Sequence, residues 1–386
     1  MLKLAWIYFI WLLVAFPVTA VNQSRTSGAG STQKRGFIST DGASLKARFE
    51  AAVERARIVS QQKPFWTGYS FPIVRGIAVD PELPLNLEQK IHGVNLRIGP
   101  DAYTPNVGIL LLHDPPSQSI TRFEVYNLDR QHDYNGFAVY WLGVADTAES
   151  LEYLAGLDRP GQNAHALENL PLAMAIHNGP QVEAALKDRL RNSRFEKVRA
   201  ASAMWLGRVV PGQQSFLLDV ARNERETNEV RSHAIWGLTY EKSLPVLPVL
   251  QELYQTVSST ELKEHIIASI AENIDQGNSA DFLIQVARED ADRDLRKTAT
   301  FWLGQFIVQQ DFTGLSKSEE AKHGKTLRDK RAFDAIKQIP DEDAVPVLIQ
   351  IAKTHSAAEM RKEAFQCLAE IGNKQVLEFF AQYLSK

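Results

Sequence analysis

Apolar and polar positions recur with a fixed period through the second half of the chain. Six twelve-residue segments share a similar order of apolar and small residues. They begin at Val198, Val230, Leu262, Leu295, Arg328 and Met360. Aligned on their centres, neighbouring segments are separated by 32 or 33 residues. In the first segment, Val198, Trp205 and Val209 are spaced as one face of a helix is. The pattern therefore predicts a repeated helix.

A second apolar stripe lies between successive segments, for example at 216–221 and 345–351. Each repeat is therefore expected to be a pair of helices joined by polar turns. A two-helix unit of this length cannot bury both of its faces alone, so such units stack into arrays. We predict a mainly α fold over residues 161–386, a right-handed α-solenoid of helix pairs with a period of 32–33 residues.

The residues expected in the turns agree with this interpretation. An acid near the start of four second helices suits the positive end of the helix dipole. These acids are Glu229, Glu261, Asp294 and Glu359. The predicted N-caps are Asn228, Thr260 and Asp292. The glycines expected to end helices in a left-handed conformation are Gly207, Gly304 and Gly372.

Five of the segments open with an apolar residue followed by a base. The pairs are Val198-Arg199, Val230-Arg231, Leu262-Lys263, Leu295-Arg296 and Met360-Arg361. This pattern resembles the second helix of HEAT repeats, including the short repeats of phycobilisome-lyase-type proteins. Residues 301–305 and 344–349 are also similar to segments of exported bacterial HEAT-repeat proteins. The resemblance implies a binding array whose second helices line a concave surface.

One repeat departs from the pattern. Asp329 replaces the basic residue of the fifth segment, and residues 309–326 before it have almost no apolar stripe. We expect a loosely packed or partly disordered, solvent-exposed helix there, as the weak point of the array.

Residues 36–160 do not follow the repeat and predict a small α+β cap at the end of the array. Helices are expected at 45–62 and 148–157. Strands are expected at 65–74, 108–112, 120–128 and 137–141, the last two forming a hairpin. An alternative is that 139–157 is a decayed repeat, because Trp141-Leu142-Gly143 recurs at 205–207 and 302–304.

The N-terminus and the charge bear on location and partners. Residues 1–20 combine Lys3, an apolar run and small residues before a cleavage site, which predicts a signal peptide and an exported, periplasmic or extracellular protein. An uncleaved anchor is the alternative. Residues 21–35 read as a flexible linker. The net charge of −3 argues against nucleic-acid binding, and the single Cys367 is expected to be a buried small hydrophobe.

Histidines and acids offer the chemistry for an enzyme, although no catalytic motif is present. His113, Glu124 and His132 could form a metal or acid/base site in the cap, whereas His113-Asp114 and His132-Asp133 are also ordinary turn formers. His233 and His265 occupy equivalent places in adjacent repeats. They are weak metal candidates, and inter-repeat packing is the favoured interpretation.

Two further groups have alternative roles. The bases Arg199, Arg231, Lys263, Arg296 and Arg361 form a column that suits an anionic ligand or, as we favour, pairs with acids of the turns. A second group alternates along a predicted strand and suits a sugar- or peptide-binding platform or burial against the helix at 45–62. Its members are Phe65, Trp66, Tyr69 and Phe71.

These patterns favour a non-enzymatic scaffold, without a cofactor or membrane span after signal cleavage, that binds a protein or peptide. The expected contacts on the concave face are Arg199, Ala203, Arg231, Lys263, Arg296 and Thr300. The alternative is a hydrolase or metal-dependent enzyme with its site in the cap and the solenoid presenting substrate. A bilin lyase-like role is a third possibility suggested by repeat type, and export argues against it.

Overall fold

The computed structural model describes residues 36–59, 63–79, 89–91, 94–240, 245–272, 279–309, 333–355 and 357–384. The chain divides into two compact units, Met1–Tyr240 and Glu241–Lys386. The predicted signal and linker, Asp329 and nearly all of the weak helix at 309–326 lie outside the described residues. Within the described part, no helix is long and apolar enough to cross a membrane.

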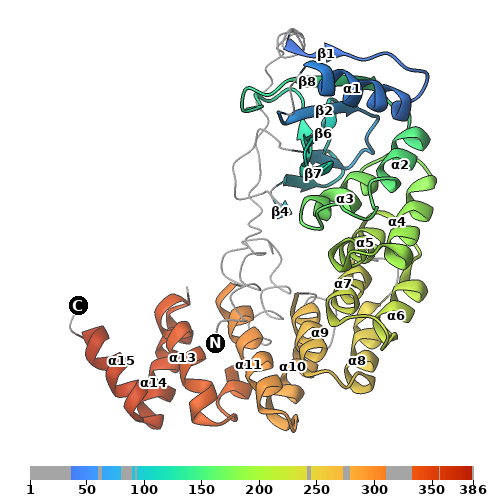
Figure 1. Cartoon of the computed structure of the whole chain (residues 1–386). Coiled ribbons are helices and arrows are strands. Elements are labelled where there is room, and N and C mark those ends of the chain that lie inside the picture. The colour runs from blue at the N-terminus through green and yellow to red at the C-terminus, as the bar shows by residue number, and fades with distance from the viewer. Residues whose placement is uncertain are drawn as a thin grey trace. The chain divides into compact units, whose positions relative to one another are not determined.

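A five-stranded sheet organises the start of the first unit (Figure 1). In spatial order its strands are β1 (Ile38–Ser39), β8 (Val139–Val144), β2 (Phe65–Ser70), β6 (Val107–Asp114) and β7 (Ser119–Asn127). Strands β6 and β7 form the hairpin. Strand β8 pairs in parallel with β2, along the edge of β2 that faces away from β6. The prediction of a β7–β8 hairpin is therefore wrong. Tyr140 and Leu142 of β8 are buried, because β8 is an interior strand with β1 on one side and β2 on the other.

A second, three-stranded sheet was not predicted. It has the order β3 (Ile77–Val79), β5 (Val94–Ile98) and β4 (Gln89–Ile91), with both pairings antiparallel. The alternating apolar residues of β5 were the available signal, because Val94 and Leu96 are buried and the intervening residue is polar.

Helices α1 (Leu45–Val59) and α2 (Thr147–Ala155) accompany the sheet. Leu45, Ala52 and Ala56 are the buried residues of α1. The four aromatic residues at 65, 66, 69 and 71 are all buried, which excludes an exposed platform. Trp66 packs with Leu110, Leu112 and Val139, so the predicted burial against the helix at 45–62 does not describe this residue. Trp141 lies in a strand, so the decayed-repeat alternative is wrong.

Helices follow to the end of the first unit. They are η4 (Ala166–Asn169), α3 (Leu170–Ala175), α4 (Gln181–Asn192), α5 (Glu196–Val209), α6 (Gln214–Arg222) and α7 (Asn228–Thr239). The second unit contains α8 (Val246–Thr256), α9 (Thr260–Glu272), α10 (Ser279–Glu289), α11 (Arg293–Gln309), α13 (Asp341–Thr354), α14 (Ala358–Ile371) and α15 (Lys374–Leu384). A further helical turn spans 333–336. The protein is thus mainly helical with a small N-terminal region of strands.

Five of the six repeated segments are helices in the structure: α5, α7, α9, α11 and α14. Residues 328–332 of the remaining segment lie outside the described residues. The handedness and period of the array stay predictions. Acids do occupy the first turns of α7, α9, α11 and α14 as expected.

Helix caps agree with the prediction only in part. Asp292 accepts the amide of Asp294 at 2.9 Å and Gly372 is left-handed at φ 55°, as expected. The cap of α7 is Thr227 rather than Asn228, and Ser259 rather than Thr260 accepts the amide of Leu262. An oxygen one residue earlier points at the free amides of the first turn, and helix periodicity does not resolve a shift of one residue.

Gly207 and Gly304 lie inside helices rather than at left-handed ends. A Cβ added at Gly207 would overlap the backbone carbonyl of Gly237, and one at Gly304 would overlap a methyl group of Val347. These glycines therefore permit close approach between helices, in place of the helix ending that was predicted.

Candidate functional site

The arginine side chains of the predicted basic column donate hydrogen bonds to backbone carbonyls at the end of the preceding helix. Arg199 donates to the carbonyl of Ser193 at 3.1 Å. Arg231 donates to that of Ala221 at 2.9 Å, and Arg296 to that of Asp290 at 2.8 Å. Arg361 donates likewise to the carbonyl of His355. These carbonyls lie at or just past the end of the preceding helix, so the arginines satisfy groups that would otherwise lack partners.

This geometry corrects the expected role of the column. Carbonyls are the shared partners of the four arginines, and Arg199 in addition pairs with the acid Glu226 at 3.4 Å. Lys263 lies over the ring of Tyr254, with its Nζ 5.0 Å from the centroid. The arginines of the column therefore brace individual helix pairs, and the predicted pairing with an acid is seen at Arg199.

Three of the six expected contact residues have no exposed side chain to offer. Ala203 is 0% exposed, Thr300 is 1% exposed and Arg231 is 7% exposed. Thr300 also donates to the carbonyl of Arg296, one helical turn earlier. The expectation of exposed contacts at these three positions is therefore wrong.

The open stripe of the second helices begins two residues before the basic column. In α7, Glu229 is exposed and His233, Trp236 and Tyr240 are partly exposed along one line at i, i+4, i+7 and i+11. Two residues correspond to about 200° around a helix, which turns Arg231 away from this line. The exposed line of α7 therefore lies on a different side of the helix from Arg231.

In the first unit this stripe is rich in aromatic and basic groups. Arg208 of α5 lies over the ring of Tyr240 at 4.7 Å from the centroid and donates to its hydroxyl at 3.3 Å. The rings of His233 and Trp236 are 5.1 Å apart. Trp, Tyr and Arg are the residue types that most often dominate binding energy at protein interfaces.

In the second unit the equivalent stripe is acidic. The acids at partly or fully exposed positions are Glu261 and Glu272 on α9, Asp294 on α11, and Glu359, Glu363 and Glu370 on α14. Burial together with Asp294 and Asp292 raises the pKa of Glu264 beside them. Negative potential therefore accumulates along the second helices of this unit.

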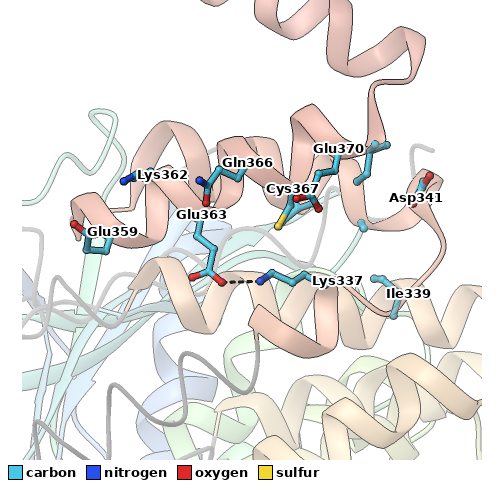
Figure 2. A pocket seen from close by; sticks show the side chains of 12 residues that line it. Lys337, Ile339, Asp341, Glu359, Lys362, Glu363, Gln366, Cys367 and Glu370 are labelled. Atoms are coloured by element: carbon cyan, nitrogen blue, oxygen red, sulfur yellow. Dashed lines mark hydrogen bonds and ion pairs between the residues drawn. The ribbon is translucent and has the colours of Figure 1, made fainter.

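The stripe of α14 forms one wall of a groove of about 510 Å³ (Figure 2). Glu359, Lys362, Glu363, Gln366 and Glu370 follow this wall along one face of the helix. The remaining lining residues are Lys337, Ile339, Asp341, Ala344, Leu348, Cys367 and Ile371. Both walls belong to the second unit.

The groove has an apolar floor and a charged rim. Ile339, Leu348 and Cys367 are buried at its base. Lys337 bridges the walls, with its Nζ 2.6 Å from Glu363 Oε1 (Figure 2). Burial raises the pKa of the Cys367 thiol, which confirms the expectation that Cys367 acts as a small buried hydrophobe.

The proposed site in the cap is not assembled. His113 is buried between the rings of Phe49 and Phe65 and hydrogen-bonds to Thr67 Oγ1 at 2.8 Å. Glu124 of β7 is paired with Leu110 of β6, and Leu110 lies three residues before His113 on β6. Successive side chains of a strand alternate between faces, so Glu124 lies on the opposite face from His113.

Glu124 does meet His132, with 2.6 Å between Oε2 and Nε2. The imidazole is enclosed by aromatic rings, its centroid 4.3 Å from that of Tyr134 and 4.7 Å from that of Tyr126. Asp133 accepts the amide of Asn135, as a turn former does. The pair therefore anchors the loop before β8 to the sheet.

A buried chain of hydrogen-bonded polar side chains in the first unit was not predicted. Tyr69 hydroxyl lies 2.9 Å from Ser150 Oγ, which lies 2.7 Å from His177 Nε2. His177 Nδ1 lies 2.7 Å from the carbonyl of Ala173, which can only accept, so Nδ1 carries the proton. Burial lowers the pKa of His177 to about 4 and raises that of Tyr69. The chain joins β2, α2 and α3 as neutral groups.

A metal site is likewise not seen in the described ranges, where no group of three His, Cys, Asp or Glu side chains is placed to hold an ion. His233 and His265 belong to different units. The ring of His233 contacts Trp236, and its Nδ1 lies 2.8 Å from the carbonyl of Glu229. Burial lowers the pKa of His265. Each ring is thus engaged within its own unit.

Comparison with known proteins bears on the second unit. A family model described as HEAT repeats matches residues 321–386. This part of the chain therefore carries HEAT repeats. No curated protein matches this sequence. Among solved structures, human deoxyhypusine hydroxylase in complex with glycerol has 18% identity and a TM-score of 0.30, over 61% of this chain and 90% of that chain.

The groove is formed by these HEAT repeats, since its lining residues, from Lys337 to Ile371, all lie within the matched range. HEAT repeats supply it with two packed helices as walls and a floor of core side chains. A preformed groove of this kind can hold a chain segment without reorganisation, which reduces the entropy lost on binding.

Proposed function

We propose that this protein is a non-enzymatic scaffold that holds a protein partner on the open stripe of its second helices. The observation that carries the proposal is that this stripe stays accessible while an apolar face of each second helix is buried. In α7, for example, Val230, Ala234 and Leu238 are 0% exposed, whereas Glu229 on the other side is exposed. HEAT arrays present such surfaces along their length.

The composition of the stripe supports a protein partner. The first unit offers Trp236, Tyr240 and Arg208 close together, and such clusters form binding hot spots. The second unit offers a groove with an apolar floor and a charged rim. A small substrate would instead favour an enclosed pocket with convergent polar groups.

The location outside the cytoplasm rests on the signal-like residues 1–20 alone. The competing enzyme in the cap loses its named site, because His113 and Glu124 lie on opposite faces of the sheet. No step of catalysis is assigned to the chain.

Affinity capture with matched baits tests the scaffold. The full chain and its Trp236→Ala and Phe216→Ala variants are immobilised and exposed to extract of the source cells. Phe216 is an aromatic residue on α6, outside the open stripe, where Lys187 and Arg191 lie over its ring. We expect a partner that is retained by the chain and by Phe216→Ala and lost by Trp236→Ala.

Equal retention by all three baits would place binding elsewhere. The proposal fails outright if the folded chain retains no protein in repeated captures. Circular dichroism of each bait beforehand shows that the two variants are folded.

A further inference from the structure

The groove beside α14 has a surplus of negative charge. Of its lining residues, four are acids and two are bases. Lys337 is held by Glu363 at 2.6 Å and by Asp334 at 3.7 Å, so it offers little charge to a ligand. Asp341, Glu359 and Glu370 are exposed, and within the described residues none of them has an ion-pair partner. Lys362 is the remaining base on the rim.

The same bias extends over the unit. Residues 241–386 contain 23 acids and 18 bases, whereas residues 1–240 contain 23 acids and 25 bases. The net charge of the whole chain therefore conceals a negative second unit. A field of this sign attracts cationic segments and repels nucleic acid.

The shape of the groove fits an extended chain. From Glu359 to Glu370 its wall follows α14 over about 16 Å, since a helix rises 1.5 Å per residue. An extended peptide covers that length with about five residues. The floor of Ile339, Leu348 and Cys367 is buried, so the surface that the groove offers to a ligand is mainly its charged rim.

Resting on the proposed scaffold function, we propose that this groove binds an extended basic segment of the partner protein. The segment carries several lysine or arginine side chains along its length. These cations pair with Asp341, Glu359 and Glu370 on the rim. Because these acids are exposed, binding weakens as salt concentration rises.

Fluorescence anisotropy of the full chain tests this assignment. The probe is fluorescein-labelled Gly-Lys-Lys-Leu-Lys-Lys-Gly, and its comparison is the same peptide with glutamate in place of each lysine. We expect the basic peptide to bind at low salt, with affinity falling on addition of 0.5 M NaCl. We expect no binding of the acidic peptide.

A charge-reversal variant tests whether the peptide binds in the groove. Glu370→Lys should weaken binding of the basic peptide about tenfold, which corresponds to about 1.4 kcal/mol. Glu370→Gln should weaken it about threefold, as expected for loss of one exposed pair without a new repulsion. The matched control is Glu378→Lys, an exposed acid of α15 in the same unit that does not line the groove.

Equal weakening by Glu370→Lys and Glu378→Lys would overturn the assignment, because it would show only an effect of net charge. So would equal binding of the two peptides, or no binding of either. Partner capture that depends on Trp236 would survive each of these results, so failure of the groove and failure of the scaffold remain distinguishable.

Discussion

The strand module, taken together with η4 and α3 as residues 36–177, and the repeat helices after it differ in where they place polar side chains. In the module, Ser150 and Thr67 are buried and hydrogen-bonded to the buried imidazoles of His177 and His113. In the repeats, charged side chains line the open stripe, or they brace helix ends as Arg231 does. Buried polar pairs fix one arrangement of a core, whereas exposed charges stay available to a partner. The module is therefore suited to rigidity and the repeats to binding.

Lowering the pH should produce the largest difference in stability between the two regions. Burial lowers the pKa of His113 to about 3 and that of His177 to about 4, below the value of about 6.5 in an unfolded chain. Protonation therefore favours the unfolded state, and stability present above pH 6.5 is lost as pH falls. At pH 5 each histidine should lower the free energy of unfolding by about 2 kcal/mol.

Hydrogen exchange at pH 7.5 and 5.0, corrected for intrinsic rates, measures this loss in β2 and in α14. We expect protection to fall chiefly in β2. His177→Phe should remove about half of the difference, while His165→Asn, at an exposed histidine side chain, should leave it unchanged. An unchanged pH dependence in His177→Phe would contradict the interpretation.

Close helix contact in the repeats should be the next most sensitive feature. In Gly207→Ala the new Cβ would overlap the backbone of Gly237, which cannot move without separating α5 from α7. We expect a loss of about 3 kcal/mol, the upper range for overpacking. Gly304→Ala meets only a methyl group of Val347, and we expect about 1 kcal/mol.

Urea unfolding of the two glycine variants gives both values. If Gly304→Ala proved as destabilising as Gly207→Ala, the distinction between backbone and side-chain contact would be wrong.

Breaking the polar chain of the module should have a somewhat smaller effect. Ser150→Ala leaves the buried Tyr69 hydroxyl and His177 Nε2 without their partner. We expect a loss of about 2 kcal/mol in urea unfolding. Adding Tyr69→Phe to Ser150→Ala should restore part of it, because an apolar ring needs no partner. Additive losses in the double variant would show that the two groups are not coupled.

The smallest expected effect distinguishes the two environments of the basic column. Arg231→Ala removes a buried donor to the carbonyl of Ala221, and we expect a loss of about 1.5 kcal/mol. Lys263→Ala removes only a half-buried contact with Tyr254, and we expect about 0.5 kcal/mol. Thermal unfolding of both variants measures the difference. A purely ligand-binding role for Arg231 would leave the melting temperature unchanged.

Helix periodicity predicted most of the described repeat helices, because a helix must keep its apolar residues on one face at every turn. It could not identify which polar side was open. Arg231 and Glu229 are both polar and two residues apart, so only the carbonyl of Ala221 decides that the arginine turns inward. The same ambiguity concealed the function of Gly207, since glycine suits both helix ends and helix crossings.

The strand order of the module illustrates the limit more sharply. The segments that form β6, β7 and β8 were predicted as strands from their apolar residues, yet a polar link between β7 and β8 fits either a hairpin or a crossing. The position of β8 depends on what covers Tyr140 and Leu142, and that cover comes from residues distant in the sequence.

The sequence by itself determined the repeated helices, the mainly α fold and the polarity of their first turns, because these depend on interactions within a few residues. Tertiary structure alone decided the meeting of Tyr69, Ser150 and His177, the separation of His113 from Glu124, and the groove between Lys337 and α14. Each of these depends on packing between segments, where burial and hydrogen-bond geometry are set by neighbours that periodicity does not specify.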